Sequence, residues 1–245
     1  MRRTVTVALA ATLATPLAAQ DDTTGFYAGG LVTLGTDIYV GDNDEAAGLP
    51  LIGYRGDGFS IGTDGASVQV LDRGDATLNL FAAPRFFALT DVDTPELEGV
   101  DRDVTLDLGV RYSVDIASRT VLDLSLAQEV TGEHDGQEID ARLSQGFNLG
   151  PVPLTAFGGV TWRSDDLSRY MFGVFDGEAR VGRAAYDPGA TTTPYLGLRG
   201  GYPLSDRALL IGTLRVDFLG SDIEDSPIVD EDTAVSLGLG VRFSF

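Results

Sequence analysis

Apolar and polar residues alternate with a period of two along much of this chain, most clearly at its end. From Val235 to Phe245 every second residue is apolar, and Ser, Gly or Arg stands between them. This period is typical of a β-strand with one apolar and one polar face. A strand that ends on two such Phe residues, Phe243 and Phe245, indicates an outer-membrane barrel, whose apolar face and aromatic edge contact lipid while its polar face lines a lumen.

The same alternation predicts twelve strands. They cover residues 25–40, 49–55, 59–62, 66–72, 76–89, 101–114, 119–131, 137–149, 152–163, 192–202, 206–220 and 232–245. Tight connections alternate with long ones, and an even count returns the C-terminus to the side of the N-terminus, as barrels require. Residues 59–62 are too few to span a membrane, and glycines surround them, so ten strands is the alternative.

We therefore predict an all-β fold for residues 20–245: a closed antiparallel transmembrane β-barrel of about 12 strands. Short turns are expected on the periplasmic side and long acidic loops on the extracellular side. No later run of apolar residues is long enough for a membrane-spanning helix, and there is no Cys to form a disulfide. The net charge of −20, with no Lys among the 17 basic residues, argues against nucleic acid as a partner.

The N-terminus predicts export. Arg2 and Arg3 precede an apolar, Ala-rich run, and Ala18-Ala19 offers a small-residue cleavage site before the polar residues that follow. Residues 1–19 are interpreted as a signal peptide, with a short membrane anchor as the alternative. With the alternating strands, this predicts the outer membrane of a Gram-negative cell, where lipid and lipopolysaccharide surround the protein. The terminal residues Val241, Phe243 and Phe245 resemble the signal by which the barrel assembly machinery recognises its substrates.

Charged residues fall on the predicted inner face of the strands, in equal numbers of each sign. The inward positions are Arg111, Arg142, Arg163, Arg199, Arg215 and Arg242, and Asp107, Asp123, Glu129, Glu138, Asp140 and Asp217. Balanced charges can pair across a narrow interior, where an unpaired charge is costly. This favours a filled lumen over a wide pore, although open porins also carry both signs.

Aromatic residues mark two further features. An interfacial aromatic girdle is predicted from the aromatic residues near the strand ends, with a partner-binding patch as the alternative. These residues are Tyr112, Trp162, Tyr202, Phe243 and Phe245. The longest connection, residues 164–191, contains the candidate mouth-loop residues Tyr170, Phe172, Phe175 and Tyr186. A loop of this length is usually functional or disordered, and its aromatics disfavour disorder. It is expected to fold over the barrel mouth or to form a β-extension packed on its own aromatics.

Catalytic and metal chemistry have weak signals. His134, the single His, lies between Glu133 and Asp135 and could act in a hydrolase at the barrel rim, but a hairpin turn made by Asp135-Gly136 is the preferred interpretation. The acidic segments 42–45 and 222–232 could bind divalent cations, yet they lack an EF-hand spacing. No catalytic, cofactor or metal residue is therefore assigned, and a non-enzymatic protein without a cofactor is expected.

Several segments, in order along the mature chain, resemble one family. They are Gly53-Tyr54-Arg55 with Phe59–Gly62, the His134-containing turn 130–136, Tyr170–Val174 with Ala185–Gly189, and Asp225–Val229. From about Gly25 to Phe245 the chain resembles the MipA/OmpV family of outer-membrane proteins. The Asp- and Gly-rich first segment departs from the family pattern.

The resemblance implies a barrel without family-wide catalytic residues. It implies a scaffold that joins a lytic transglycosylase to a peptidoglycan synthase, since that role names the family. A porin-like channel for small solutes and a surface adhesin are the alternatives.

Overall fold

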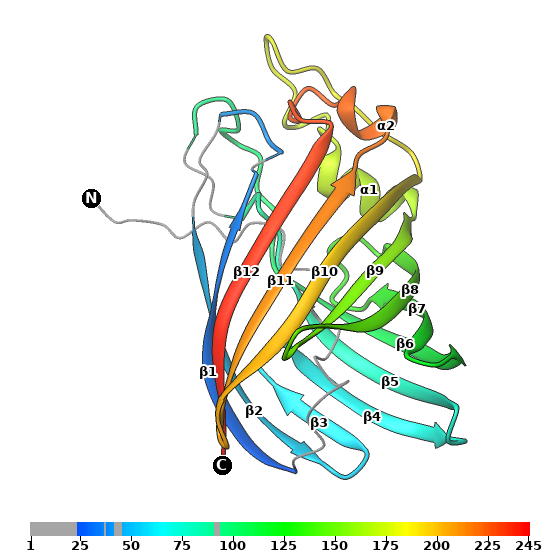
Figure 1. Ribbon diagram of the computed structural model, residues 1–245. Helices are drawn as coiled ribbons and strands as arrows, with labels where there is room; N and C mark the ends of the chain where they lie inside the picture. The colour runs from blue at the N-terminus through cyan, green and yellow to red at the C-terminus, as the bar shows by residue number, and fades with distance from the viewer. Residues whose placement is uncertain (1–23, 37, 42–45, 91–93) are drawn as a thin grey trace.

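The computed structural model describes residues 24–36, 38–41, 46–90 and 94–245. The predicted signal peptide, residues 1–19, and the acidic residues Asp42, Asp44 and Glu45 lie outside this part of the chain. Twelve antiparallel strands form one closed barrel, in which each strand pairs with its neighbours in sequence and β1 pairs with β12 (Figure 1). The predicted fold class is confirmed, and the ten-strand alternative is wrong.

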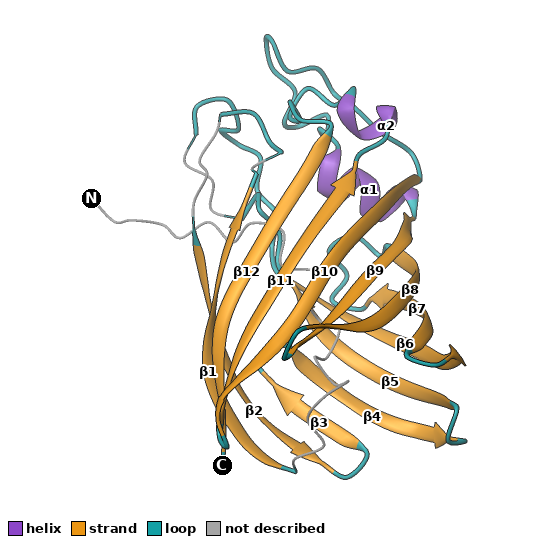
Figure 2. Cartoon of the chain, in the orientation of Figure 1, coloured by secondary structure: helices purple, strands orange, loops and turns teal. Residues whose placement is uncertain are grey.

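The strands follow the alternation closely. They are β1 (Gly25–Gly35), β2 (Ala47–Gly56), β3 (Phe59–Gly62), β4 (Gly65–Asp72), β5 (Ala76–Arg85), β6 (Thr105–Ala117), β7 (Thr120–Glu129), β8 (Gln137–Leu149), β9 (Val152–Arg163), β10 (Thr191–Ser205), β11 (Ala208–Phe218) and β12 (Thr233–Ser244). Two short helices, α1 (Asp165–Phe172) and α2 (Ser221–Glu224), lie at one end of the barrel (Figure 2). We call this the loop end; the C-terminus lies at the opposite, turn end.

The outer surface of the barrel is apolar. Large hydrophobic side chains such as Val32, Leu124, Leu196 and Leu239 point outward from their strands and remain exposed. The exposed face of Tyr112, Tyr202, Phe243 and Phe245 adds aromatic rings to this surface, and Trp162 is half-buried. An exposed apolar band with aromatic rings is what lipid requires of a barrel. No helix of the described residues is long and apolar enough to cross a membrane.

Three predicted strands are too long at the loop end by four or five residues. The first ends at Gly35 rather than at residue 40, the fifth ends at Arg85 rather than at residue 89, and the sixth begins at Thr105 rather than at residue 101. The apolar residues beyond these limits, among them Tyr39 and Leu89, are buried. They leave the barrel wall and pack with other loops, so an apolar run continues where the strand does not.

Because β3 is short, the barrel wall between β2 and β5 does not extend as far toward the loop end as the remaining wall does. It pairs with β2 only along Gly53–Gly56, and β4 reaches β5 only as far as Ala82. Within the described residues, positions 47–52 of β2 and 83–85 of β5 therefore have a strand partner on one side only. Unpaired backbone groups are costly in lipid, so these edges need another solution.

Side-chain capping and proline supply that solution. The Thr63 amide donates to the Ile52 carbonyl oxygen at 2.9 Å, and its hydroxyl donates to the Pro50 carbonyl oxygen at 2.7 Å. Pro50 lies in the part of β2, and Pro84 in the part of β5, that has a strand partner on one side only. Proline has no N–H to leave unpaired and is found in sheets at such edges. The two prolines, which would be expected to break a strand, thus lie at the two edges of the shortened part of the wall.

We expect deletion of Phe245 to reduce the amount of membrane-inserted protein sharply. The Phe245 amide donates to the Phe26 carbonyl oxygen at 2.9 Å, which extends the β1–β12 seam by one bond. The ring is 74% exposed on the lipid side, so its loss also removes apolar anchoring at the interface. The measurement is the folded, heat-modifiable fraction in isolated outer membranes. Phe245→Tyr is the matched control, and normal insertion of the deletion variant would contradict the predicted assembly role.

Candidate functional site

The predicted inward charges lie inside the barrel. Seven of them are buried: Asp107, Asp123, Glu129, Arg142, Arg163, Arg215 and Asp217; so is Arg242, at the β1–β12 seam. Arg111, Glu138, Asp140 and Arg199 are half-buried. The middle layer is made of ion pairs, the loop end is closed by packed loops, and the turn end contains a polar cavity.

Glu138 is at the centre of the ion-pair layer. Its carboxylate lies 3.1 Å from the Arg85 guanidinium and 3.3 Å from that of Arg163. Arg85 also pairs with Asp107 at 2.6 Å. All four side chains are at most 13% exposed. Their opposite charges therefore compensate one another in a region that excludes most water. Such a layer is stable only while every charge keeps its partner.

Further contacts extend this layer across the lumen. Arg215 makes a two-pronged pair with Asp217, with distances of 2.6 to 3.0 Å, and its guanidinium lies 3.6 Å from the centre of the Tyr195 ring. The Tyr195 hydroxyl donates to Asp140, and the Thr161 hydroxyl does so from the neighbouring strand. Together with the pairs of Arg85, these contacts involve side chains of β5, β6, β8, β9, β10 and β11 in the barrel interior.

Three members of this layer, Arg85, Thr161 and Tyr195, are absent from the sequence prediction. Arg85 could have been found, because it continues the inward period of β5 through Asn79 and Phe81. Tyr195 could also have been found, because it lies four residues before Arg199 in the predicted strand 192–202, and the period of two that turns Arg199 inward turns Tyr195 inward as well.

Packed loops close the loop end. Residues from the connections 36–46, 86–104, 164–190 and 219–232, together with Ala234 of β12, form one buried apolar cluster, which we call the loop cap. Its buried members are Ile38, Tyr39, Phe87, Ala88, Leu89, Leu97, Val100, Leu167, Tyr170, Met171, Phe172, Val174, Leu219, Ile223, Ile228, Val229 and Ala234. Phe175 and Tyr186 pack against it. The four mouth-loop residues therefore come together over the lumen.

The mouth loop contains the helix α1, which neither predicted form of this loop, a loop over the barrel mouth or a β-extension, included. Ser164 caps α1 by accepting from the Leu167 amide, and Asp165 and Asp166 occupy the first turn. Acidic residues at a helix N-terminus are favourable, and a Ser followed by two Asp is a readable start signal. The remaining segment contains a small β-contact between Val174 and Tyr186. The helix buries Tyr170, Met171 and Phe172 in the loop cap.

Arg102 joins the parts of the loop cap. It is 1% exposed, and it donates to the Tyr170 carbonyl oxygen at 2.5 Å and the Gly173 carbonyl oxygen at 3.2 Å. It also pairs with Glu178 at 2.5 Å and lies 4.7 Å from the centre of the Phe175 ring. The predicted strand alternation would have turned this residue toward lipid, so the sequence pattern could not reveal its role.

His134 lies under the loop cap. Its Nδ1 accepts from the Gly136 amide at 3.0 Å, and its ring packs 4.8 Å from that of Tyr170. Burial lowers the pKa of His134, although the Glu129 carboxylate acts in the opposite direction. Among the described residues, Nε2 has no hydrogen-bond partner, so no serine or threonine hydroxyl is held there for activation.

Glu129 explains the shape of the turn that holds His134. Its carboxylate accepts from the Thr131 amide and hydroxyl, from the Gly132 amide at 2.9 Å and from the Asp135 amide at 2.9 Å. Asp135 has a positive φ of 55°, as a tight turn requires. The hairpin interpretation of Asp135-Gly136 therefore agrees with the geometry. The described residues contain no group of three or more metal-ligating side chains.

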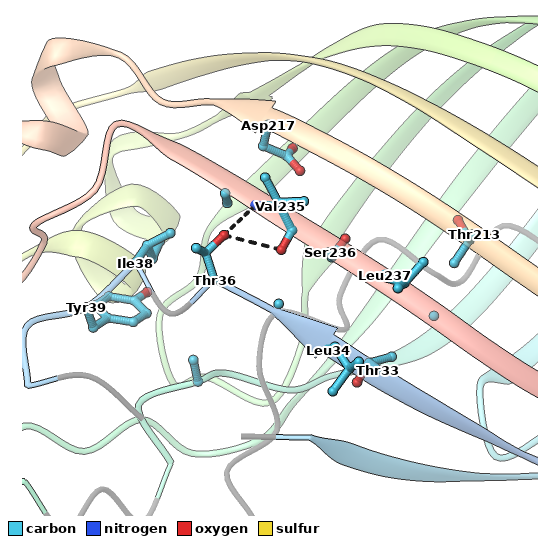
Figure 3. A pocket seen from close by; sticks show the side chains of 14 residues that line it. Thr33, Leu34, Thr36, Ile38, Tyr39, Thr213, Asp217, Val235, Ser236 and Leu237 are labelled. Atoms are coloured by element: carbon cyan, nitrogen blue, oxygen red, sulfur yellow. Dashed lines mark hydrogen bonds between the residues drawn. The ribbon is translucent and has the colours of Figure 1, made fainter. Parts of the chain in front are cut away.

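A small cavity marks where the loop cap meets the wall. It measures about 30 Å³ and lies between β1, β12 and the residues Ile38 and Tyr39 (Figure 3). The Thr36 hydroxyl bridges β1 to β12 there, since it donates to the Val235 carbonyl oxygen and accepts from the Val235 amide. This volume has room for one or two water molecules. It is a packing gap rather than a binding site.

The turn end contains a much larger cavity of about 960 Å³. Five arginines and three aspartates contribute to its lining: Arg55, Arg111, Arg119, Arg142, Arg199, Asp57, Asp72 and Asp123. Serine, threonine and asparagine side chains occupy much of the remaining wall. The exposed rim residues Asp57 and Arg119 belong to the tight turns, so the cavity opens at the turn end.

Comparison with known proteins identifies the family. Residues 28–245 match the family model described as MltA-interacting protein MipA. The chain belongs to the MipA family. Among curated members, this MipA-family chain is 28% identical to outer membrane protein OmpV of Vibrio cholerae over 225 residues, which cover 90% of this chain and 87% of OmpV. It is 26% identical to the MltA-interacting protein of Escherichia coli K12, with 86% and 83% covered. The predicted family is confirmed.

A solved structure agrees with the barrel architecture. The toluene transporter TbuX of Ralstonia pickettii superposes with a TM-score of 0.50 at 11% identity, over 91% of this chain and 90% of TbuX. At this identity the likeness concerns the fold alone. The MipA-family chain is therefore an outer-membrane β-barrel protein, as its relatives named outer membrane proteins are.

Proposed function

We propose that this protein is a non-enzymatic scaffold in the outer membrane, with its loop end outside the cell, its turn end toward the periplasm, and residues 1–19 removed on export. The observation that carries the proposal is the closed interior. The loop cap and the ion-pair layer beneath it lie between the large cavity and the loop end. A barrel filled in this way offers a rigid surface more readily than a path for solutes.

The name of a relative supports the choice of partner. The Escherichia coli family member at 26% identity is named for its interaction with MltA. We propose by extension that this chain binds a lytic transglycosylase and a peptidoglycan synthase through its periplasmic turns. The tight turns at 57–58, 118–119, 150–151 and 206–207 would present that surface, and they are exposed.

His134 does not favour enzymatic activity. Its Nδ1 is used by the turn itself, and its Nε2 lies buried against the loop cap. A general base must reach the proton that it removes, and a buried nitrogen beneath aromatic rings does not meet this condition.

Planar-bilayer recording tests the closed barrel. We expect the purified, refolded protein to insert without discrete conductance steps, because charged side chains and loops fill its lumen. Replacing residues 174–186 by a short Gly-Ser linker removes part of the loop cap, and this variant is the matched comparison. Reproducible steps from the unaltered protein would overturn the proposal in favour of the small-solute channel.

Partner capture tests the scaffold itself. The refolded protein, immobilised through an engineered single Cys in an exposed loop, should retain the purified lytic transglycosylase and peptidoglycan synthase of the same bacterium. The chain has no native Cys, so the attachment point is unique. A silent barrel that binds neither enzyme would remove the scaffold and leave the surface adhesin as the next candidate.

A further inference from the structure

We infer that the turn-end cavity is a binding site for a small organic anion that carries more than one carboxylate or phosphate group. The inference goes beyond the scaffold proposal and is independent of it. It rests on the charge of the cavity, on its size, and on a buried hydroxyl in its lining that has no hydrogen-bond partner within the described residues.

The first observation is an excess of positive charge. Five arginines stand against three aspartates in the lining. Asp57 and Asp72 are exposed at the rim, whereas Asp123 is buried and pairs with Arg142 at 2.9 Å. The inner part of the cavity therefore contains the guanidinium groups of Arg111, Arg142 and Arg199 with a single carboxylate.

These three guanidinium groups influence one another electrostatically. Arg142 acts on Arg111, and both act on Arg199, whereas the Asp123 carboxylate acts in the opposite sense on Arg111 and Arg199. Phenylalanine rings support two of them: Arg111 lies 5.1 Å from the centre of the Phe81 ring and Arg199 lies 5.9 Å from that of Phe157. Like charges that are held together on rigid strands repel one another, and a bound anion would offset this repulsion.

The second observation is the Ser144 hydroxyl. Ser144 is 4% exposed and lines the cavity, yet its Oγ has no hydrogen-bond partner within the described residues. Buried polar groups nearly always have a partner. The hydroxyl is screened from the open cavity in its present rotamer, and rotation about χ1 would bring it beside the arginine cluster, where it could donate to an anion oxygen. The neighbouring Ser113 hydroxyl, by contrast, already donates to Asp123 at 2.5 Å.

The third observation is size and position. A volume of about 960 Å³ is at the upper end of the range of about 300–1,000 Å³ that is usual for small-molecule pockets. The whole chain carries a net charge of −20, so an excess of arginine in one cavity runs against its overall composition. The acidic loop residues Asp222 and Glu224 lie at the opposite end of the barrel. The cavity is thus the place where this protein would attract an anion.

Calorimetric titration of the refolded, full-length mature protein with citrate tests the inference. Sodium chloride keeps the ionic strength constant, because simple screening would otherwise imitate binding. We expect saturable binding of citrate and weaker binding of inorganic phosphate, and no binding of a neutral sugar of similar size. Arg199→Gln and Arg111→Gln should each weaken citrate binding by about tenfold, as expected for loss of a charged hydrogen-bond donor.

Two further variants separate a binding role from a structural one. Ser144→Ala removes the unpartnered hydroxyl of the lining without removing charge, and it should weaken citrate binding by a few-fold while the heat-modifiable barrel is retained. Arg207→Gln removes the same charge from the exposed β10–β11 turn, outside the cavity lining, and it should leave citrate binding unchanged. Absence of saturable citrate binding, or equal losses in the Arg199 and Arg207 variants, would overturn the inference.

Discussion

Replacing Glu138 by alanine is expected to destabilise the folded barrel by about 3–5 kcal/mol, the usual cost of breaking a buried ion pair by removal of one partner. Glu138 faces Arg85 at 3.1 Å and Arg163 at 3.3 Å, and both arginines are 6% exposed on their side chains. Arg85 keeps Asp107 as a partner in the variant. Arg163 loses its carboxylate, so most of the penalty should come from this residue.

Urea unfolding in lipid vesicles measures this effect directly. The single Trp162 pairs across the strands with Ile139, next to Glu138, so its fluorescence reports on this part of the wall. Glu133→Ala, in the exposed turn of the same hairpin, is the matched control and should change the free energy of unfolding by less than about 1 kcal/mol. Adding Arg163→Met to Glu138→Ala should recover part of the loss, since it removes the uncompensated charge. An unchanged midpoint for Glu138→Ala would show that water reaches this layer and compensates the charge.

Arg102→Met is expected to open the loop cap. The substitution keeps apolar volume but removes the donors that hold the carbonyl groups of Tyr170 and Gly173 and the carboxylate of Glu178. The Glu178 carboxylate would keep only the Phe175 amide as a donor, and the loss of its charge partner together with the donors to two buried carbonyl groups costs several kcal/mol. We expect the segment 164–190 to become sensitive to protease in intact vesicles, while the strands of the barrel remain protected.

A second arginine of the mouth loop provides the control for Arg102. Arg169 lies 3.7 Å from Asp187, and both side chains are more than 40% exposed. Exposed pairs of this kind contribute about 0–1 kcal/mol, so Arg169→Met should leave the protease pattern as in the unaltered protein. If both variants became equally sensitive, the loop cap would depend on overall charge rather than on the buried contacts of Arg102.

The two halves of the interior suit different tasks. The ion-pair layer and the loop cap fill the lumen toward the loop end, whereas the turn-end half keeps a large polar cavity. A protein closed on one side and hollow on the other can serve as a fixed element of the membrane and still bind a solute from the turn side. The scaffold surface and the anion cavity share the rim residues Asp57, Gly58 and Arg119, whereas Arg111, Arg142 and Arg199 line the cavity away from the turns.

The sequence by itself determined the barrel wall. A strand has a period of two, and lipid demands an apolar outer face in every strand, so each strand leaves a readable pattern. The alternation located all twelve strands, including the short β3, and it placed residues such as Arg142 and Asp217 on the inner face. Errors occurred where Tyr39 and Leu89 continued an apolar run beyond the strand end.

Only the tertiary structure decided what fills and closes the wall. The partners of Glu138 come from β5 and β9, and the contacts of Arg102 join connections about 70 residues apart in the sequence. These contacts follow from the closure and register of the barrel, which bring distant residues together, and no local period encodes them. The loop cap likewise depends on four loops that meet in space, because the apolar residues of each loop are buried against those of the others.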